Sequence, residues 1–143
     1  MIANLGSGTP YTSQVFPTPI TGEISPSTEG SLNGSRLPWQ FTLNANIDKS
    51  FELTFGEGEG QKKAFLNVYF WISNVLNTQN ITGVYRFTGT PDDDGYLAAA
   101  QYQPQIDTKN DPDAYRNYYS MYVNNPFNLG VPRTIRLGVK LDF

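Results

Sequence analysis

Three consecutive aspartates, Asp92, Asp93 and Asp94, are the clearest candidates for metal chemistry in the chain. Carboxylate oxygens suit calcium, but a calcium-binding loop takes its ligands from alternating positions. Adjacent side chains cannot all turn toward one ion, so the spacing favours a solvated turn. We keep these three residues as weak metal candidates and expect no cofactor.

The residue types that most catalytic sites need are missing. The 143 residues include no cysteine and no histidine, which removes thiol chemistry, disulfides and the commonest general base. A hydrolase built on carboxylates such as Asp92 and Asp107 is an alternative, but no nucleophile motif accompanies them. The net charge of −3 gives no indication of nucleic-acid binding. The composition therefore predicts a protein that is not an enzyme.

Aromatic side chains are the second kind of candidate. Asp111, Pro112 and Asp113 have the pattern of a helix start, because Asp caps the end, Pro suits the first position and a second Asp complements the helix dipole. The tyrosines that follow recur at helical spacing, so they form one stripe. That stripe would either pack the helix onto its own loop or offer a platform for stacking sugars. Its members are Tyr115, Tyr118, Tyr119 and Tyr122.

The elements that must position these residues are strands. From Pro132 to Phe143, apolar and polar residues alternate. Because a strand turns successive side chains to opposite faces, one face is apolar and the other is charged. A charged face suits water better than a second packed layer, and a membrane barrel provides that arrangement, with lipid outside and a polar lumen inside. The apolar set is Ile135, Leu137, Val139, Leu141 and Phe143.

Residues 38–55 and 63–76 alternate in the same way. The apolar side of the first stretch carries one misfit, Lys49, which would either reach the headgroups near the strand's end or mark a bulge that shifts the register. Residues 39–53 would span roughly 50 Å, whereas sandwich strands have about 5–6 residues. In the second stretch we expect the aliphatic side chains to face lipid. Tyr69 and Trp71 would then face the lumen, where they pack against neighbours or contact a transported ligand.

The connections predict the topology. Residues 56–60 form a short Gly/Glu turn, whereas residues 13–37 and 77–131 form long loops at the other end of the strands. We expect residues 1–12 to contain part of another strand, and consider an extension of the third strand to residue 88. Outer-membrane barrels combine short periplasmic turns with long extracellular loops. The prediction is an all-β, antiparallel transmembrane β-barrel segment with one short loop helix and with Phe143 at the periplasmic side.

Several motifs carry a resemblance to a known family. They are GSGTPY at 6–11, LNGSRLPW at 32–39, LNVY at 66–69, NVLNT at 74–78, VYRFTG at 84–89, DDGYL at 93–97, NPF at 125–127 and PRTIRLG at 132–138. Together they resemble the carboxy-terminal end of TonB-dependent receptors from the Bacteroidetes outer membrane, over essentially the whole chain.

The resemblance implies the last three to four strands of a barrel of about 22 strands that imports a nutrient such as an oligosaccharide, a peptide or a metal chelate. It also implies that the strand ending at Phe143 is the signal read by the barrel assembly machinery. Implied partners are the rest of the barrel, TonB through a plug domain that this chain lacks, a surface lipoprotein and outer-membrane lipid. Because the chain also begins without a secretory signal, we expect it to be the tail of a longer precursor.

Three alternatives stay open. A soluble β-sandwich that binds carbohydrate would have short strands and two packed inner faces. A structural or secretion-linked barrel without transport activity would share the fold and differ only in function. A separate subunit that pairs with a partner chain would share the sequence pattern. Under the barrel interpretation, the candidate ligand contacts are Tyr69, Trp71, Tyr96, Tyr115, Tyr118 and Tyr122.

Overall fold

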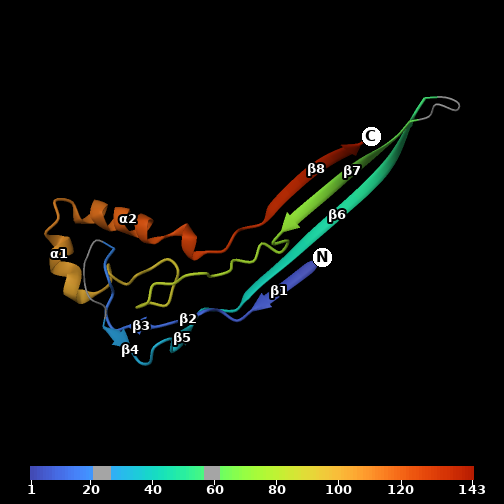
Figure 1. Cartoon of the computed structure of the whole chain (residues 1–143). Coiled ribbons are helices and arrows are strands. Elements are labelled where there is room, and N and C mark those ends of the chain that lie inside the picture. The colour runs from blue at the N-terminus through green and yellow to red at the C-terminus, as the bar shows by residue number, and fades with distance from the viewer. Residues whose placement is uncertain (21–26, 57–61) are drawn as a thin grey trace. The chain divides into compact units, whose positions relative to one another are not determined.

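The computed structural model describes residues 1–20, 27–56 and 62–143. The chain divides into two compact units (Figure 1). The sheet unit contains residues 1–5, 41–78 and 131–143, and the loop unit contains residues 6–40 and 79–130.

The sheet unit consists of four strands in the order β1-β6-β7-β8 (Figure 1). These strands are β1 (Ile2–Gly6), β6 (Gln40–Phe55), β7 (Lys62–Ser73) and β8 (Thr134–Asp142). β7 pairs antiparallel with β6 on one side and with β8 on the other. The predicted antiparallel, all-β class is therefore confirmed, and each long strand lies within a few residues of its expected limits.

The register between the long strands contains no bulge. Each residue from Ala45 to Phe55 has its own partner on β7, and the ladder between β7 and β8 is equally continuous. Lys49 lies opposite Val68, with paired residues on both sides. Both explanations offered for Lys49 are therefore wrong, because the register does not shift there and the strand does not end nearby.

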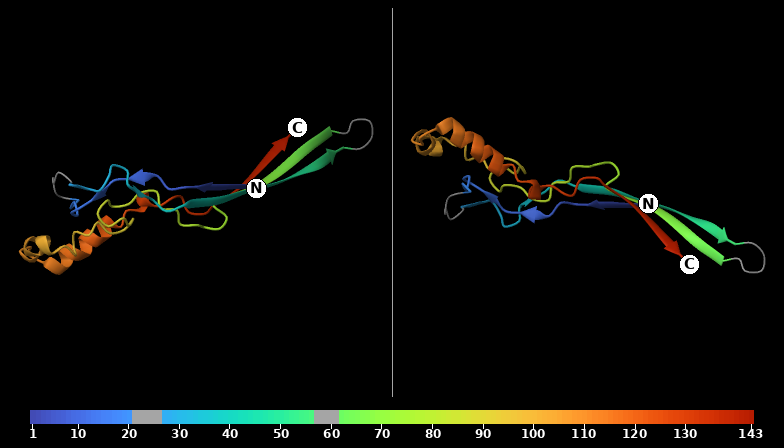
Figure 2. Two further views of the ribbon diagram at one scale, coloured as in Figure 1. Left: turned by 90° about the horizontal axis from the view of Figure 1, so that it is seen from below. Right: turned by 90° about the horizontal axis from the view of Figure 1, so that it is seen from above.

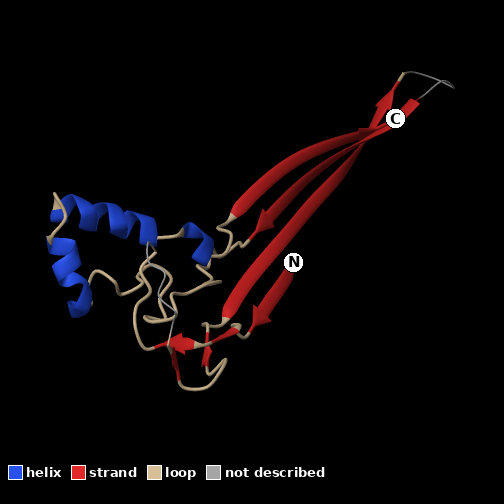
Figure 3. Ribbon diagram, turned by 60° about the vertical axis from the view of Figure 1, so that its left-hand side comes forward, coloured by secondary structure: helices blue, strands red, loops and turns tan. Residues whose placement is uncertain are grey.

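The ladder aligns side chains of one kind across the strands. The apolar set of β7 lies on the same face as Leu137 and its apolar neighbours on β8, and as the odd-numbered residues of β6. No described element of the sheet unit covers either face, and Figures 2 and 3 show the strands fanning apart as in a twisted sheet. The sheet unit therefore has no second layer among its described residues.

β7 ends because the backbone turns at Asn74. Asn74 and Asn77 adopt φ values of 53° and 52°, a left-handed conformation that asparagine tolerates better than most residues. The Asn74 side chain accepts a hydrogen bond from the Thr78 backbone N–H at 3.0 Å and donates one to the Thr78 carbonyl at 3.0 Å. The predicted extension of this strand to residue 88 is therefore wrong. Beyond the turn, Ile81 makes an isolated bridge with Leu129.

The first long connection holds secondary structure of its own. Between β1 and β6, β2 (Pro10–Tyr11) pairs with β5 (Ser35–Arg36), and β3 (Ser13–Gln14) pairs with β4 (Thr28–Glu29), both antiparallel. An irregular loop over 13–37 was expected, so two short ladders were missed. Two-residue strands are too short for periodicity to reveal them.

The second long connection contains two α-helices where one was expected. They are α1 (Gln103–Asp107) and α2 (Pro112–Val123), with 3-10 turns η2 (Ala100–Tyr102) and η3 (Pro126–Asn128). The predicted start of α2 is confirmed, since Asp111 caps it by accepting a hydrogen bond from the Ala114 backbone N–H at 2.9 Å. None of the helices in the described residues is long and apolar enough to cross a bilayer.

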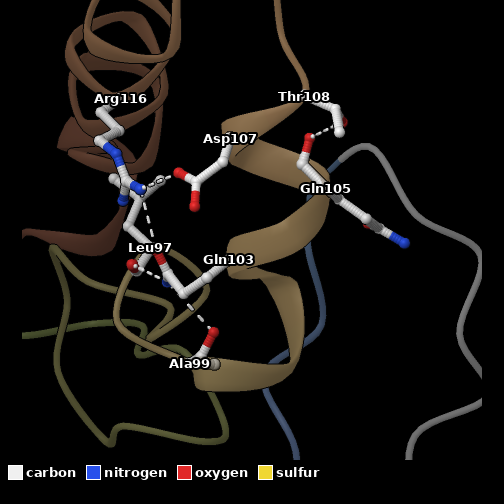
Figure 4. A network of polar contacts seen from close by, with 7 residues as sticks. All are labelled: Leu97, Ala99, Gln103, Gln105, Asp107, Thr108 and Arg116. Carbon is white, nitrogen blue, oxygen red and sulfur yellow. Dashed lines mark hydrogen bonds and ion pairs between the residues drawn. The ribbon is translucent and has the colours of Figure 1, made fainter.

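An arginine of α2 joins the two helices. Arg116 Nη2 donates to Gln103 Oε1 at 2.9 Å and pairs with Asp107 Oδ1 at 3.1 Å (Figure 4). Gln103 in turn donates to the carbonyl oxygens of Leu97 and Ala99. This network fixes α1 against α2 and against the segment before it.

The predicted hairpin turn at 56–60 lies, apart from Gly56, outside the described residues.

Candidate functional site

The sheet presents one face of apolar side chains to its surroundings. Leu137 and Ile47 are each 64% exposed, and Phe70 between them on β7 is 38% exposed. Burial of Leu43, Val68, Phe70 and Leu137 in a small globule would have contradicted the barrel interpretation, and none of the four is buried. The proposed assembly-signal residues of β8 lie on the same face and are exposed. They are Ile135, Leu137, Val139, Leu141 and, directly after the strand, Phe143.

The opposite face carries the polar and charged side chains of the sheet. Ser50, Asn67 and Lys140 form one row across the three strands, and Asn46, Trp71 and Arg136 form another. The Asn67 Oδ1 atom is buried and has no hydrogen-bond partner among the described residues. An unpaired buried acceptor costs about 1–3 kcal/mol, so this row favours a further donor such as water or a group outside the chain.

Trp71 and Arg136 form the aromatic feature of this polar face. The Arg136 guanidinium carbon lies 6.0 Å from the centre of the Trp71 ring, within the range of a cation–π contact. Trp71 also borders a cavity of about 270 Å³ in the sheet unit. An aromatic ring beside amide side chains could stack on a planar or sugar ligand. The cavity is lined by Met1, Ile2, Asn44, Ala45, Asn46 and Trp71.

Tyr69, the second residue expected to face the lumen, has its ring over the neighbouring strand β8. It is directly opposite Gly138 of β8, and a Cβ atom added to that glycine would lie 2.0 Å from Tyr69 Cζ. The tyrosine ring therefore occupies the space that any other residue at 138 would need. Sequence reasoning did not single out Gly138, although a glycine inside a strand often marks such a close approach.

A cluster of tyrosines forms the core of the loop unit. The rings of Tyr96 and Tyr102, and of Tyr96 and Tyr119, lie with centroids 4.7 Å apart, in tilted arrangements that aromatic pairs favour. Ile106 is fully buried beside them. Tyr96 is only 3% exposed, so the structure assigns it to this core instead of to a ligand-contacting surface.

The tyrosine stripe of α2 divides between core and surface. Tyr119 is buried and Tyr115 is half-buried, with Lys109 Nζ 5.4 Å from the Tyr115 ring centre. Tyr118 and Tyr122 are 74% and 70% exposed. The two pairs differ by about 60° around the helix, so only one edge of the stripe turns inward. Core packing and an exposed aromatic surface therefore coexist on α2.

Asp94 is the carboxylate around which this core is organised. It is buried, and its Oδ2 accepts a hydrogen bond from the Tyr119 hydroxyl at 2.5 Å while Oδ1 accepts one from the Tyr96 backbone N–H at 3.0 Å. The Tyr119 hydroxyl also accepts from the Ile20 backbone N–H at 3.2 Å. Burial, followed by the hydrogen bond to Asp94, raises the pKa of Tyr119, and burial raises the pKa of Tyr96 to about 12.

These contacts engage three carboxylate oxygens of the aspartate triplet with hydrogen-bond donors. Asp93 Oδ1 accepts from the Gly95 backbone N–H at 2.8 Å, and both oxygens of Asp94 are engaged. Asp92, Asp93 and Asp94 do border a cavity of about 250 Å³, together with Tyr119 and apolar side chains of the loop unit. Among the described residues, however, no group of three or more potential ligands is placed to hold a metal ion.

Comparisons with protein-family models, with curated proteins and with solved structures found no match to the chain. The functional argument therefore depends on the two faces of the sheet and on the loop unit's own contacts.

Proposed function

We propose that this chain is part of a TonB-dependent transporter of the Gram-negative outer membrane, in which it supplies strands of the barrel and extracellular loops for nutrient import. The observation that carries the proposal is the exposed apolar face shared by β6, β7 and β8. A water-soluble sheet would bury such a face under another layer. Lipid is the environment in which an uncovered apolar face on one side and a charged face on the other is stable.

The edges of the sheet support the same proposal. β1 and β8 each have a strand on one side only among the described residues. Within hydrocarbon, an unpaired backbone group costs several kcal/mol, so further strands must pair with both edges. We infer that these strands come from the same precursor or from a partner chain, and that the assembly machinery acts on β8 and Phe143.

The polar face would then line an aqueous lumen, and the loop unit would lie outside the cell. Trp71, Tyr69 and the exposed tyrosines of α2 are the groups available for an oligosaccharide, a peptide or a metal chelate. TonB would act through a plug domain, a surface lipoprotein could cap the loops, and Phe143 would lie at the periplasmic side. On this proposal the chain has no catalytic role.

Cysteine labelling of the outer-membrane form of the protein tests the proposal. The chain has no native cysteine, so Leu137→Cys and Arg136→Cys each provide one labelling site, on adjacent residues of opposite faces. We expect an environment-sensitive dye at position 137 to be quenched by spin-labelled lipid and the dye at position 136 to be quenched by aqueous iodide. Equal quenching of both dyes by iodide would contradict the proposal.

The strongest rival is a soluble carbohydrate-binding sandwich. Strands of 16 and 12 residues exceed the usual length for such a fold, and the described residues of the sheet unit supply no second sheet to pack against. A barrel without transport activity would pass the labelling test equally. Loss of uptake in cells that lack TonB separates transport from a structural role.

A further inference from the structure

The charged residues of the sheet unit are sorted between its two faces. Every acidic residue described on the long strands (Asp48, Glu52 and Asp142) belongs to the polar face, where Glu52 pairs with Lys63 at 2.5 Å. By the alternation of side chains, all the charged residues described on the apolar face are cations. They are Lys49 and Lys62, by pairing, and Arg133, by its position directly before β8.

Two of these cations lie at opposite ends of the apolar face. Lys62 pairs with Phe55 at the hairpin end. Arg133 directly precedes β8 at the other end, where its backbone N–H donates to Asn77 Oδ1 at 2.9 Å, beside the turn that ends β7. Both side chains are exposed, and neither has an ion-pair partner among the described residues.

The distance between the two ends of the apolar face matches the thickness of a lipid bilayer. From Lys62 to Ser73, β7 covers ~36 Å at ~3.3 Å per residue, which is ~28 Å of height for a strand tilted by ~40°. The apolar band of an outer-membrane barrel is ~25 Å tall. The two cations would therefore lie just outside the hydrocarbon, at the level of the headgroups on either side, whereas Lys49 lies ~20 Å from both along the sheet.

We propose that Lys62 and Arg133 bind the phosphate groups of lipid headgroups in the two leaflets, and that they set the depth at which the sheet lies in the membrane. This inference rests on the proposed membrane location. An ammonium or guanidinium group that meets a lipid phosphate gains a charge-assisted hydrogen bond. The absence of described carboxylates on this face means that no such group of the strands competes with the lipid or repels it.

The sequence supplies matched controls on the opposite face. Lys62 and Lys63 are adjacent lysines whose side chains point to opposite faces, so Lys62→Gln and Lys63→Gln remove the same charge at the same height. Arg133→Gln and Arg136→Gln form a similar pair on the segment leading into β8 and on the strand itself. An effect of net charge alone would be equal within each pair.

The experiment uses the outer-membrane form of the protein, in which further strands pair with both edges of the sheet. It measures binding to vesicles of phosphatidylcholine with and without phosphatidylglycerol, by the emission of a dye on Leu137→Cys. We expect Lys62→Gln and Arg133→Gln each to weaken binding to the anionic vesicles about five-fold, and Lys63→Gln and Arg136→Gln to leave it unchanged. Equal losses within each pair, or no loss in any variant, would overturn the inference while leaving the membrane proposal intact. Failure of the dye to enter either kind of vesicle would instead contradict the membrane proposal itself.

A second measurement checks the depth. With lipids quenching at different depths, the dye at position 137 should shift by a measurable amount in Lys62→Gln and in Arg133→Gln, in opposite directions, because each variant releases the sheet from one leaflet. An unchanged depth in both variants would contradict the proposed role in positioning.

Discussion

Tyr69 of β7 fills the space above Gly138 of β8, where a Cβ atom would lie 2.0 Å from Tyr69 Cζ and 2.2 Å from the Tyr69 hydroxyl oxygen. The two residues are direct partners in the ladder. A shift of β8 by two residues, which would keep its faces, would bring Arg136 or Lys140 under the ring instead. The contact therefore specifies the register of the final strand where alternation alone does not.

Replacement of Gly138 by alanine should disturb this contact. We expect Gly138→Ala to lower the free energy of unfolding by about 1–3 kcal/mol, because the added methyl group overlaps a ring held by its strand. Urea unfolding of the protein in vesicles measures the change. Gly6→Ala is the control, since a Cβ atom at Gly6 meets nothing within 4 Å. Combining Gly138→Ala with Tyr69→Ala should recover part of the loss, and strict additivity of the two changes would argue against the contact.

Lys49 should oppose membrane insertion. It lies in the middle of the apolar face, opposite Val68. A cation near the bilayer midplane of a barrel costs about 2–4 kcal/mol, so we expect Lys49→Leu to stabilise the inserted state by an amount in that range. Lys140→Leu on the polar face should give no such gain. The same urea titration in vesicles provides the measurement, and a loss of stability in Lys49→Leu would indicate that an anionic group outside the described residues pairs with Lys49.

The hydroxyl of Tyr119 should be important for the loop unit. Tyr119→Phe leaves Asp94 Oδ2 buried without its donor, so we expect a loss of about 1–3 kcal/mol in the free energy of unfolding. Near-ultraviolet circular dichroism of the tyrosine cluster follows the unfolding. Tyr118→Phe, one position earlier on the same helix, removes an exposed hydroxyl and should change the stability by less than about 0.5 kcal/mol. Similar losses in both variants would contradict the role of Asp94.

Stability of the loop unit should fall at high pH. The pKa of Tyr119 is raised by burial and by its bond to Asp94, and burial raises the pKa of Tyr96 to about 12, against an ordinary value of about 10. Since the folded state favours the neutral phenols, their contribution is complete below about pH 10 and is lost as the pH rises toward 12 and beyond. The expected slope approaches about 1.4 kcal/mol per pH unit for each tyrosine. Tyr119→Phe should reduce this slope, and Tyr118→Phe should not.

The sequence predicted the structural features that follow from local residue patterns. Alternation of apolar and polar residues located β6, β7 and β8, and the Asp111-Pro112 pattern located the start of α2, because both signals depend on local geometry. The hydrophobic alternation also predicted which face carries Leu137. These signals need no knowledge of which strands are neighbours.

Features that depend on a distant partner were missed. Nothing near Gly138 in the sequence indicates that Tyr69 lies above it, and nothing near Asp94 indicates Tyr119. The helical spacing correctly predicted that the tyrosines form a stripe on one helix. It could not show that α1 would pack against one edge of the stripe and leave Tyr118 exposed. For Lys49, a bulge in the strand was one of two expected explanations, and only the pairing with Val68 excludes it.

The uninterrupted ladders on both sides of β7 constrain how this part of the protein can change length during evolution. Deletion of Val68 would turn over the part of the strand on one side of the deletion, so that Asn67 and Tyr69, which now share a face, would lie on opposite faces relative to both β6 and β8. Removal of two residues keeps the sides but shortens the strand. Natural variants are therefore expected to gain or lose residues here in pairs, whereas the surface segments between strands can vary by any number.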